Sequence, residues 1–507
     1  MSDLVVETAA GKVSGLRKDG LAHWRGVPYA APPTGAQRFL PPRPPEPWTG
    51  ERDATRFGPL PPQSRDPRTA MMSGASAKLA MSEDCLVLNV VSPAADGARR
   101  PVVVWIHGGA FIMGSGSQPL YNGASFAARH DVVVVTINYR LSLFGLLYLG
   151  DLAGGPYRQG NAALLDQLAA LRWVRENIGG FGGDPARVTV MGESAGAISI
   201  GNLLGMPAAR GLFDRAILQS GAAALAPPGR DEATALAREV LAELGVDVPG
   251  LADVPAERLV AIQERITQER GLGAFAPFID GETIPRPPTD VVRDGEGARV
   301  PILLGSNRDE WALFAVFFGE PDPAAARAQL ARHLGDEIDR IHAGYLAARA
   351  GRPPGAGGRS PEAAALLDLV GDVGLRVPAL RLADAHARHA PAWMYRFDWE
   401  SPALGGRFGA AHALELPFVW NQLDLPVSQL FLGDVEAARP LAAKVHAAWA
   451  AFIRGDAPAA EGLPAWPRYE APRRATLLID REPRVVDDPD AMVRELWRDI
   501  PRPGIDR

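Results

Sequence analysis

The chain has 507 residues, of which 47% are apolar and 22% charged, a composition typical of a globular protein with a large core. Its formal net charge of −6 disfavours nucleic acids and anionic membranes as partners, because both attract a basic surface. The single cysteine, Cys85, excludes an intrachain disulfide, and residues 1–16 lack the basic and apolar regions of a secretory signal, so we expect a cytoplasmic protein.

The first half of the chain predicts strands. Residues 3–57 are rich in proline and predict short strands and turns wrapped along the body of the protein. Continuous Val/Ile runs follow at 85–93, 100–108 and 132–140, and such runs are typical of strands that are buried on both faces. The last run continues into the most apolar stretch of the chain, but Asn138 and Arg140 interrupt it, so it does not predict a membrane span.

Helical and strand-like segments then alternate. Residues 159–183 carry helical spacing and end in glycines, and strand-like runs follow at 187–192 and 213–221. This alternation is typical of a doubly wound α/β protein, so we expect a large, mostly parallel sheet flanked by helices.

Helical patterns also separate the later strands. Residues 229–271 and 320–390 have helical composition, whereas 299–307 and 391–399 read as strands. We therefore expect a single domain over residues 1–507, with helical insertions at about 222–298 and 315–390.

A candidate nucleophile stands where a strand meets a helix. Gly192-Glu193-Ser194-Ala195-Gly196 fits the pattern G-x-S-x-G, with an apolar strand before it and a helical pattern after it. In this context a serine occupies a sharp, strained turn at the start of a helix, whose backbone N–H groups favour negative charge. The alternative is an ordinary glycine-rich turn.

A serine nucleophile needs a base and an orienting acid, which in this architecture follow it in the order acid, then histidine. His412 is the candidate base because it lies on a loop after the strand at 391–399. The downstream alternatives lie in helical stretches where a surface role is expected: His333, His342, His386, His389 and His446. Asp309 and Glu310 both follow the strand at 299–307, and the pattern alone does not choose between them.

Backbone donors for an oxyanion are expected near the end of an earlier strand. His107-Gly108-Gly109-Ala110 follows the strand at 100–108 and is similar to the HGGG element of esterases. Glycine allows the backbone to approach a substrate oxygen closely. A plain strand-ending turn would also favour two glycines.

The quoted motifs, together with "WRGVPYAAPPTGAQRFLPP", "SEDCLVLNV", "GSNRDEW" and "HALELPFVW", resemble the type-B carboxylesterase family over nearly the whole chain. That family comprises α/β-hydrolases, among them cholinesterases and para-nitrobenzyl esterases, and the resemblance implies that the insertions cap an active-site gorge. It also implies that Glu310 is the acid of the triad. The implied oxyanion donors are the N–H groups of Gly109, Ala110 and Ala195, with supporting roles for Glu193 and Glu415.

The resemblance also bears on the substrate pocket. Cholinesterases place aromatic residues before the segment that reads "FAPFIDG" in this chain, whereas here Gly271 and Gly273 stand there, which implies a roomier acyl side. Trp311 and Phe314 are expected to line the gorge, with a role in the core as the alternative. Secreted relatives pair the cysteine that corresponds to Cys85, but this chain offers no partner for it.

The sequence therefore predicts a serine carboxylesterase that forms an acyl-enzyme on small to medium esters. No metal or organic cofactor is expected, because no cluster of His, Cys or carboxylates has ligand spacing. The alternatives are a carbamate, amide or lactone hydrolase on the same scaffold and a non-catalytic interaction module of the cholinesterase type. The natural substrate and the choice between monomer and homodimer stay open.

Overall fold

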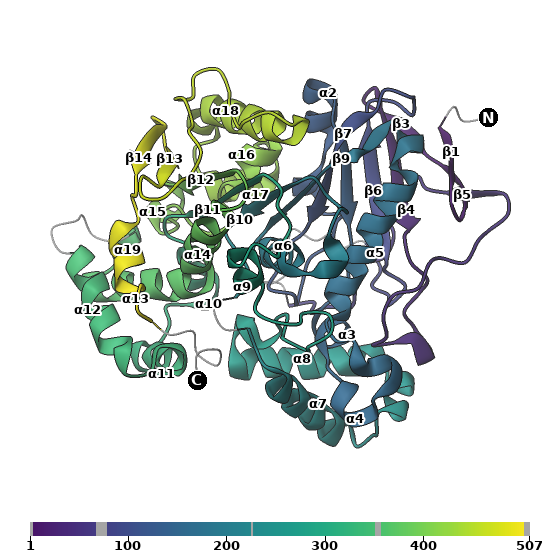
Figure 1. The fold of residues 1–507 in the computed structure, drawn as a ribbon, viewed down its shortest axis with the longest axis horizontal. Helices are drawn as coiled ribbons and strands as arrows, with labels where there is room; N and C mark the ends of the chain where they lie inside the picture. The colour runs from purple at the N-terminus through teal and green to yellow at the C-terminus, as the bar shows by residue number, and fades with distance from the viewer. Residues whose placement is uncertain (1–3, 67–78, 225–226, 350–355, 501–507) are drawn as a thin grey trace.

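A computed structural model describes residues 4–66, 79–224, 227–349 and 356–500, apart from the side chains of residues 329, 332, 333 and 356. In these residues the main sheet has 11 strands (Figure 1). From one edge to the other they are β3 (Leu16–Lys18), β4 (Leu21–Pro28), β6 (Val87–Ser92), β8 (Val133–Ile137), β7 (Arg100–Ile106), β9 (Gly183–Glu193), β10 (Arg215–Gln219), β11 (Ile302–Asn307), β12 (Ala392–Phe397), β13 (Ala475–Ile479) and β14 (Arg484–Asp487).

The centre of the sheet is parallel and its edges are antiparallel. Strands β8 to β13 run parallel in the order given, whereas β3, β4, β6 and β14 pair antiparallel with their neighbours. The expectation of a large, mostly parallel sheet is confirmed. The proline-rich start of the chain adds a small second sheet of β1 (Val5–Thr8), β2 (Gly11–Ser14) and β5 (Glu51–Asp53).

Both faces of the main sheet are covered by helices, because its central strands are apolar on both sides. In β7, Val102 and Val104 belong to one core cluster, and Val103 and Trp105 belong to the other. The first cluster includes side chains of α5 (Ala162–Asn177), α6 (Ala195–Gly205) and α14 (Val377–His386), and the second includes those of α2 (Ala124–His130), α16 (Leu416–Trp420) and α18 (Val435–Arg454).

Two helical insertions leave the sheet, one after β10 and the other after β11. The first contains α7 (Arg230–Leu244), α8 (Ala256–Arg270) and α9 (Pro288–Arg293). The second contains α10 (Ala312–Phe318), α11 (Pro323–Leu334), α12 (Ile338–Arg349), α13 (Pro361–Gly371), a π-helical turn (Asp372–Arg376) and α14. Figure 1 shows α7 and α8 below the sheet, and α11 to α13 as a separate layer at its β11 to β14 side.

The sheet contains more strands near the end of the chain than expected. Strands β13 and β14 extend the sheet past β12, and the sequence did not predict either strand. Within the described residues, no helix combines the length and apolar composition that a membrane span requires.

Candidate active site

The predicted nucleophile stands on a strained turn. β9 ends at Glu193, α6 begins at Ala195, and Ser194 between them has φ 56° and ψ −124°. A residue other than glycine in such a region costs about 1–3 kcal/mol and persists only when its surroundings fix it. Here the N–H of Ser194 donates to the carbonyl of Gln219 at 2.9 Å, and its carbonyl accepts from Ile198 at 2.8 Å.

The two flanking glycines allow this turn to pack against β7. A Cβ on Gly192 would lie 2.7 Å from the carbonyl carbon of Gly196 and 2.8 Å from the carbonyl oxygen of Ile106. A Cβ on Gly196 would overlap the same oxygen of Ile106. Side chains at either position would therefore push the serine turn away from the sheet.

The acid and the histidine meet because β11 and β12 are parallel neighbours and end at the same edge of the sheet. Nδ1 of His412 lies 2.7 Å from Oε2 of Glu310. The backbone N–H of His412 also donates to the carbonyl of Glu310 at 3.3 Å, and Oε1 of Glu310 accepts from the N–H of Asn307 at 2.7 Å. Glu310, and not the adjacent Asp309, therefore faces the imidazole.

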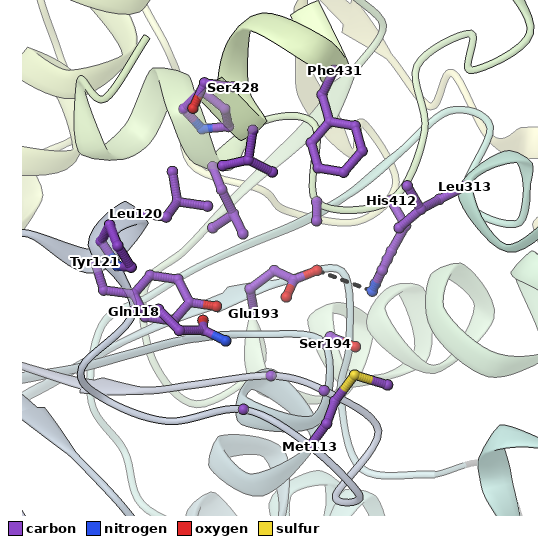
Figure 2. Close-up of a pocket in the computed structure, with 18 of the residues that line it drawn as sticks. Met113, Gln118, Leu120, Tyr121, Glu193, Ser194, Leu313, His412, Ser428 and Phe431 are labelled. Carbon is purple, nitrogen blue, oxygen red and sulfur yellow. Dashed lines mark ion pairs between the residues drawn. The ribbon is translucent and has the colours of Figure 1, made fainter. Parts of the chain in front are cut away.

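The other nitrogen of His412 faces a second carboxylate. Nε2 lies 3.0 Å from Oε1 of Glu193, and Figure 2 shows both side chains in the cavity above Ser194. Burial alone lowers the pKa of His412, but the negative charges and hydrogen bonds of Glu193 and Glu310 together raise it well above its usual value. The arrangement thus stabilises the imidazolium form of this histidine.

Ser194 lines the same cavity as His412 and Glu193. Its hydroxyl forms no hydrogen bond to any residue that the structure describes, so it is free to contact a substrate. Hydrogen bonds between catalytic groups are often absent or long until a substrate binds.

The predicted oxyanion donors lie on two segments beside Ser194. Gly109 and Ala110 have positive φ values of 109° and 53°, and the carbonyl of Gly109 accepts from Ile112 and Met113 at 2.9 and 3.1 Å. Among the described residues, the N–H groups of Gly109, Ala110 and Ala195 have no internal acceptor. Gly109 and Ala110 line the cavity and Ala195 directly follows Ser194, and unpaired donors in this arrangement suit an oxygen that becomes negatively charged.

Close packing holds the Gly109 loop against the serine turn. A Cβ on Gly109 would overlap the carbonyl of Met113. One on Gly108 would lie 2.7 Å from Oε2 of Glu193 and 3.1 Å from the Cβ of Ser194. Steric contacts therefore require glycine at both positions.

Glu415 lies behind the triad in a buried polar network. Its two carboxylate oxygens accept from the side-chain amides of Gln219 at 3.0 Å and Asn307 at 2.6 Å. Burial, aided by the nearby charge of Glu193, raises the pKa of Glu415 to about 8. Neither Gln219 nor Asn307 was predicted from the sequence, although each lies at the end of a central strand, where parallel sheets gather functional side chains.

The cavity at Ser194 has a volume of about 320 Å³ and mostly apolar walls. Of the four predicted pocket residues, Phe314 lines it, with its ring centroid 5.3 Å from that of His412. Trp311, Gly271 and Gly273 are not among its lining residues. Trp311 lies behind Phe314 and faces a small cleft beside Asp309.

Gly271 and Gly273 lie where the chain turns after α8. Gly271 turns the chain with a φ of 84°, Leu272 then lines the cavity, and Gly273 is exposed. The other lining residues come from the segment after β7 and from α10, α16 and α17 (Pro426–Leu432) or their ends; they include Met113, Gln118, Leu120, Tyr121, Leu313, Leu416, Leu425, Val427, Ser428 and Phe431. No periodic pattern marked these residues in the sequence.

Two of the alternative histidines differ from their predicted surface role. His386 and His446 are buried, and each ring contacts a backbone carbonyl, that of Val300 and that of Val419 respectively, at 2.8 Å. Their helices pack on the sheet, so a histidine on the inner face is part of the core. His389 is exposed and His342 half-buried, and the side chain of His333 is outside the described residues.

The described residues contain no group of three or more His, Cys, Asp or Glu side chains that could hold a metal ion. Cys85 is buried as a free thiol, and burial raises its pKa.

Comparison with known proteins identifies the family of the chain. The carboxylesterase family model matches residues 2–497. The para-nitrobenzyl esterase of Bacillus subtilis is 38% identical over 98% of both chains, and the phenmedipham hydrolase of Pseudarthrobacter oxydans is 37% identical over 98% of this chain and 97% of its own. A crystal structure of the Geobacillus stearothermophilus carboxylesterase EST55 superposes with a TM-score of 0.86, at 40% identity over 97% of this chain and 100% of that one.

The chain belongs to the carboxylesterase family and has the α/β-hydrolase fold of that family. It is accordingly an enzyme that hydrolyses carboxylic esters.

Proposed function

We propose that the enzyme hydrolyses small to medium carboxylic esters through a Ser194-His412-Glu310 triad and an acyl-enzyme intermediate. The observation that carries this proposal is the 2.7 Å contact between Nδ1 of His412 and Glu310, at the cavity that also exposes Ser194. A carboxylate at Nδ1 fixes the tautomer that leaves the Nε2 lone pair available to a serine.

The first half of the reaction forms the acyl-enzyme. Nε2 of His412 removes the proton of the Ser194 hydroxyl as Oγ attacks the carbonyl carbon of the ester. The carbonyl oxygen becomes an oxyanion, which the N–H groups of Gly109, Ala110 and Ala195 stabilise. The imidazolium then gives the proton to the leaving alcohol oxygen as the ester C–O bond breaks.

The second half repeats these steps with water. His412 removes a proton from a water molecule, whose oxygen attacks the acyl carbon. The tetrahedral intermediate collapses, the acid leaves, and the proton returns to Oγ of Ser194. Glu310 orients the imidazole and stabilises the imidazolium.

Glu193 limits the availability of the base. The imidazolium can donate to Glu193 and Glu310 at the same time, whereas catalysis needs an unprotonated Nε2 directed to Ser194. Activity should therefore rise with pH until His412 loses its proton. Glu193 also carries the negative charge that stabilises the imidazolium during each tetrahedral step.

The cavity supports a substrate class of modest size. About 320 Å³ of space accommodates a short acyl chain and a small alcohol, and the walls are mostly apolar. Gln118 and Tyr121 add polar side chains at one end, where a polar alcohol group could bind. We propose a cytoplasmic enzyme, because its one cysteine is a free thiol.

A hydrolysis panel on the purified protein tests this function. Nitrophenyl esters from acetate to dodecanoate are compared with phenmedipham, a nitroanilide and a lactone. We expect the highest kcat/KM for acetate to hexanoate, and no turnover by Ser194→Ala. A higher kcat/KM for phenmedipham, the anilide or the lactone than for every ester would replace this proposal with the corresponding hydrolase.

A further inference from the structure

Asp309 has a buried carboxylate that the mechanism does not use. It directly precedes Glu310 but points away from His412 and toward the loop that carries this histidine. Oδ2 of Asp309 accepts from the N–H of Ala410 at 2.9 Å, and the N–H of Asp309 donates to the carbonyl of Ala410, also at 2.9 Å. The side chain and the backbone of Asp309 therefore both hold Ala410, two residues before His412.

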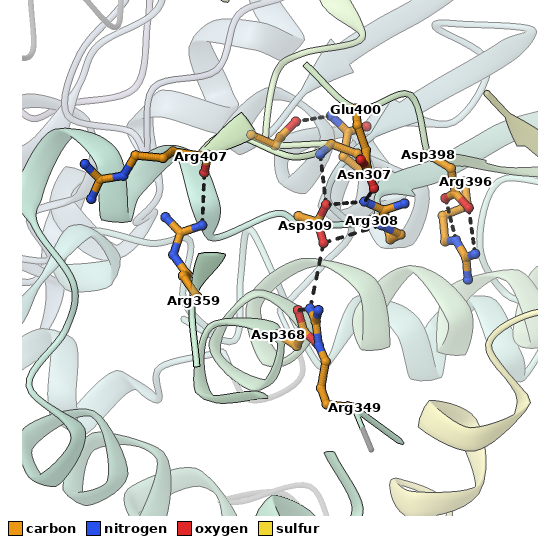
Figure 3. Close-up of polar contacts among 12 residues, drawn as sticks. Asn307, Arg308, Asp309, Arg349, Arg359, Asp368, Arg396, Asp398, Glu400 and Arg407 are labelled. Atoms are coloured by element: carbon orange, nitrogen blue, oxygen red, sulfur yellow. Dashed lines mark hydrogen bonds and ion pairs between the residues drawn. The ribbon is translucent and has the colours of Figure 1, made fainter. Parts of the chain in front are cut away.

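Arginines fix the other side of this carboxylate (Figure 3). Arg308 contacts Oδ2 at 2.8 Å and Oδ1 at 3.4 Å, and Nη2 of Arg349 lies 3.9 Å from Oδ1. Burial by itself raises the pKa of Asp309, but Arg308 and the N–H of Ala410 lower it below its usual value. The carboxylate is thus ionised at neutral pH.

Further contacts hold Arg349, Arg308 and the backbone before Asp309 in place. Arg349 ends α12 and pairs with Asp368 of α13 at 2.6 Å. Arg308 pairs with Glu400 at 2.5 Å. Arg376, which ends the π-helical turn, donates to the carbonyls of Asn307 and Arg308 at 2.8 and 2.6 Å. Residues 307–310, here called the acid loop, are therefore held by Arg376 of the insertion.

Little regular structure supports the histidine loop. Outside its contacts with residues 307–310, Arg359 donates to the carbonyl of Arg407 at 3.0 Å, and the N–H of Ser401 donates to the carbonyl of Gly409 at 2.9 Å. Gly405, Gly406 and Gly409 all adopt positive φ, and the segment between α15 (Ala403–Gly406) and α16 has no strand or long helix. Its links to the acid loop are the two contacts between Asp309 and Ala410, the amide of Asn307 on the carbonyl of Ala411, and the N–H of His412 on Glu310.

We propose that Asp309 is a positioning residue for His412: its carboxylate, held by Arg308, fixes the histidine loop through the N–H of Ala410. This inference rests on the proposed triad. Loss of the carboxylate leaves a buried N–H without an acceptor and lets the loop move, which lengthens the contact between Nδ1 of His412 and Glu310. Small displacements of a general base lower the rate of the chemical step more than they weaken binding.

Two substitutions separate the hydrogen bond from the charge. Asp309→Ala removes both. In Asp309→Asn, the amide oxygen can replace Oδ2 and keep the hydrogen bond from Ala410, while its NH2 group faces Arg349 and the charge is lost. Asp368→Ala is the matched control, because it removes a carboxylate from the same cluster that contacts Arg349 but not the histidine loop.

The measurements are kcat, KM and the acid limb of the kcat profile with pH, on a short nitrophenyl ester. For Asp309→Ala we expect kcat to fall at least fivefold with KM within twofold. His412 faces Glu193 and Glu310, with Glu415 behind them, so a looser contact with Glu310 lowers its pKa. The acid limb should move to lower pH in Asp309→Ala, and by less in Asp309→Asn. Asp309→Asn and Asp368→Ala should each keep kcat within fivefold.

Three results would overturn the proposal. They are a kcat for Asp309→Ala within fivefold of wild type, an equal loss in Asp309→Asn, and an equal loss in Asp368→Ala. If Asp309→Ala does not fold, Asp309→Ser replaces it under the same criteria, because a serine hydroxyl is too short to reach Ala410. Ser194→Ala is assayed in parallel: turnover by that variant refutes the proposed triad, whereas the Asp309 series refutes only the positioning role.

Discussion

Nε2 of His412 lies 3.0 Å from Oε1 of Glu193, the residue immediately before the proposed nucleophile. Because Nδ1 of the same ring contacts Glu310, the imidazole lies between two buried carboxylates. Two carboxylates, one at each ring nitrogen, stabilise the protonated form of His412. In the proposed mechanism the neutral ring must accept the proton of Ser194 at the same nitrogen that contacts Glu193.

The first prediction concerns the dependence of activity on pH. Glu193 raises the pKa of His412, and catalysis requires the neutral ring, so activity is lost as the pH falls through this raised pKa. Glu193→Gln removes one of the two charges and should move the acid limb of kcat/KM to lower pH. Glu436→Gln, on the exposed side of α18, is the control and should leave the limb unchanged. An unchanged or higher midpoint in Glu193→Gln would show that Glu193 does not stabilise the imidazolium.

The second prediction concerns the tautomer of His412. In Glu310→Gln the amide oxygen must keep the hydrogen bond from the N–H of Asn307, so the NH2 group faces Nδ1. The ring then carries its proton on Nε2 and cannot accept one from Ser194. We expect kcat to fall by about 10³–10⁴, as for the loss of the acid in other triads, with little change in the melting temperature. A variant with more than a tenth of wild-type kcat would exclude Glu310 as the orienting acid.

A third prediction concerns the stability of the serine turn. At φ 56° and ψ −124°, residue 194 is strained with any side chain, whereas glycine adopts this region readily. Ser194→Gly should therefore unfold at a higher temperature than Ser194→Ala, although glycine makes the unfolded chain more flexible. Thermal unfolding of the two inactive variants measures the difference. A lower melting temperature for the glycine variant would mean that the turn is not strained.

A fourth prediction concerns acyl-chain length. Leu272 lines the cavity and is held there by the turn at Gly271, so a larger side chain should shorten the space for the substrate. Leu272→Phe should lower kcat/KM for nitrophenyl octanoate by about tenfold or more relative to acetate, since one or more displaced methylene groups are worth about 1–3 kcal/mol. Leu272→Ala should raise kcat/KM for nitrophenyl octanoate relative to acetate. Equal changes for both esters in both variants would place the acyl chain elsewhere.

The central sheet could be predicted because its strands are continuous apolar runs. The runs at 100–108, 132–140, 187–192, 213–221, 299–307 and 391–399 correspond to the parallel strands β7 to β12. The short strands β13 and β14 were missed. β14 has only four residues, two half-buried ones between two exposed ones, so it gives no periodic signal. The buried β13 is an apolar run as long as β8 and β10, and its composition could have predicted it.

The candidate site could be predicted from the sequence only in part. The pattern around Ser194 has a steric basis that glycine spacing reveals, but the choice between Asp309 and Glu310 depends on which way adjacent side chains point. Asp309 pairs with Ala410 and Arg308, and Glu310 faces His412, only because this segment lies alongside the loop after β12. The cavity residues come from separate segments, and their convergence follows from tertiary packing alone.

The central claim is that Ser194 is the nucleophile, and a covalent label tests it most directly. The wild-type enzyme is treated with an organophosphate, digested and analysed by peptide mass spectrometry, with Ser194→Ala and heat-unfolded wild type as controls. We expect one phosphoryl group on the peptide that contains Ser194, complete loss of esterase activity with its incorporation, and no label in either control. A label on a different residue, or an active enzyme with fully labelled Ser194, would contradict the account.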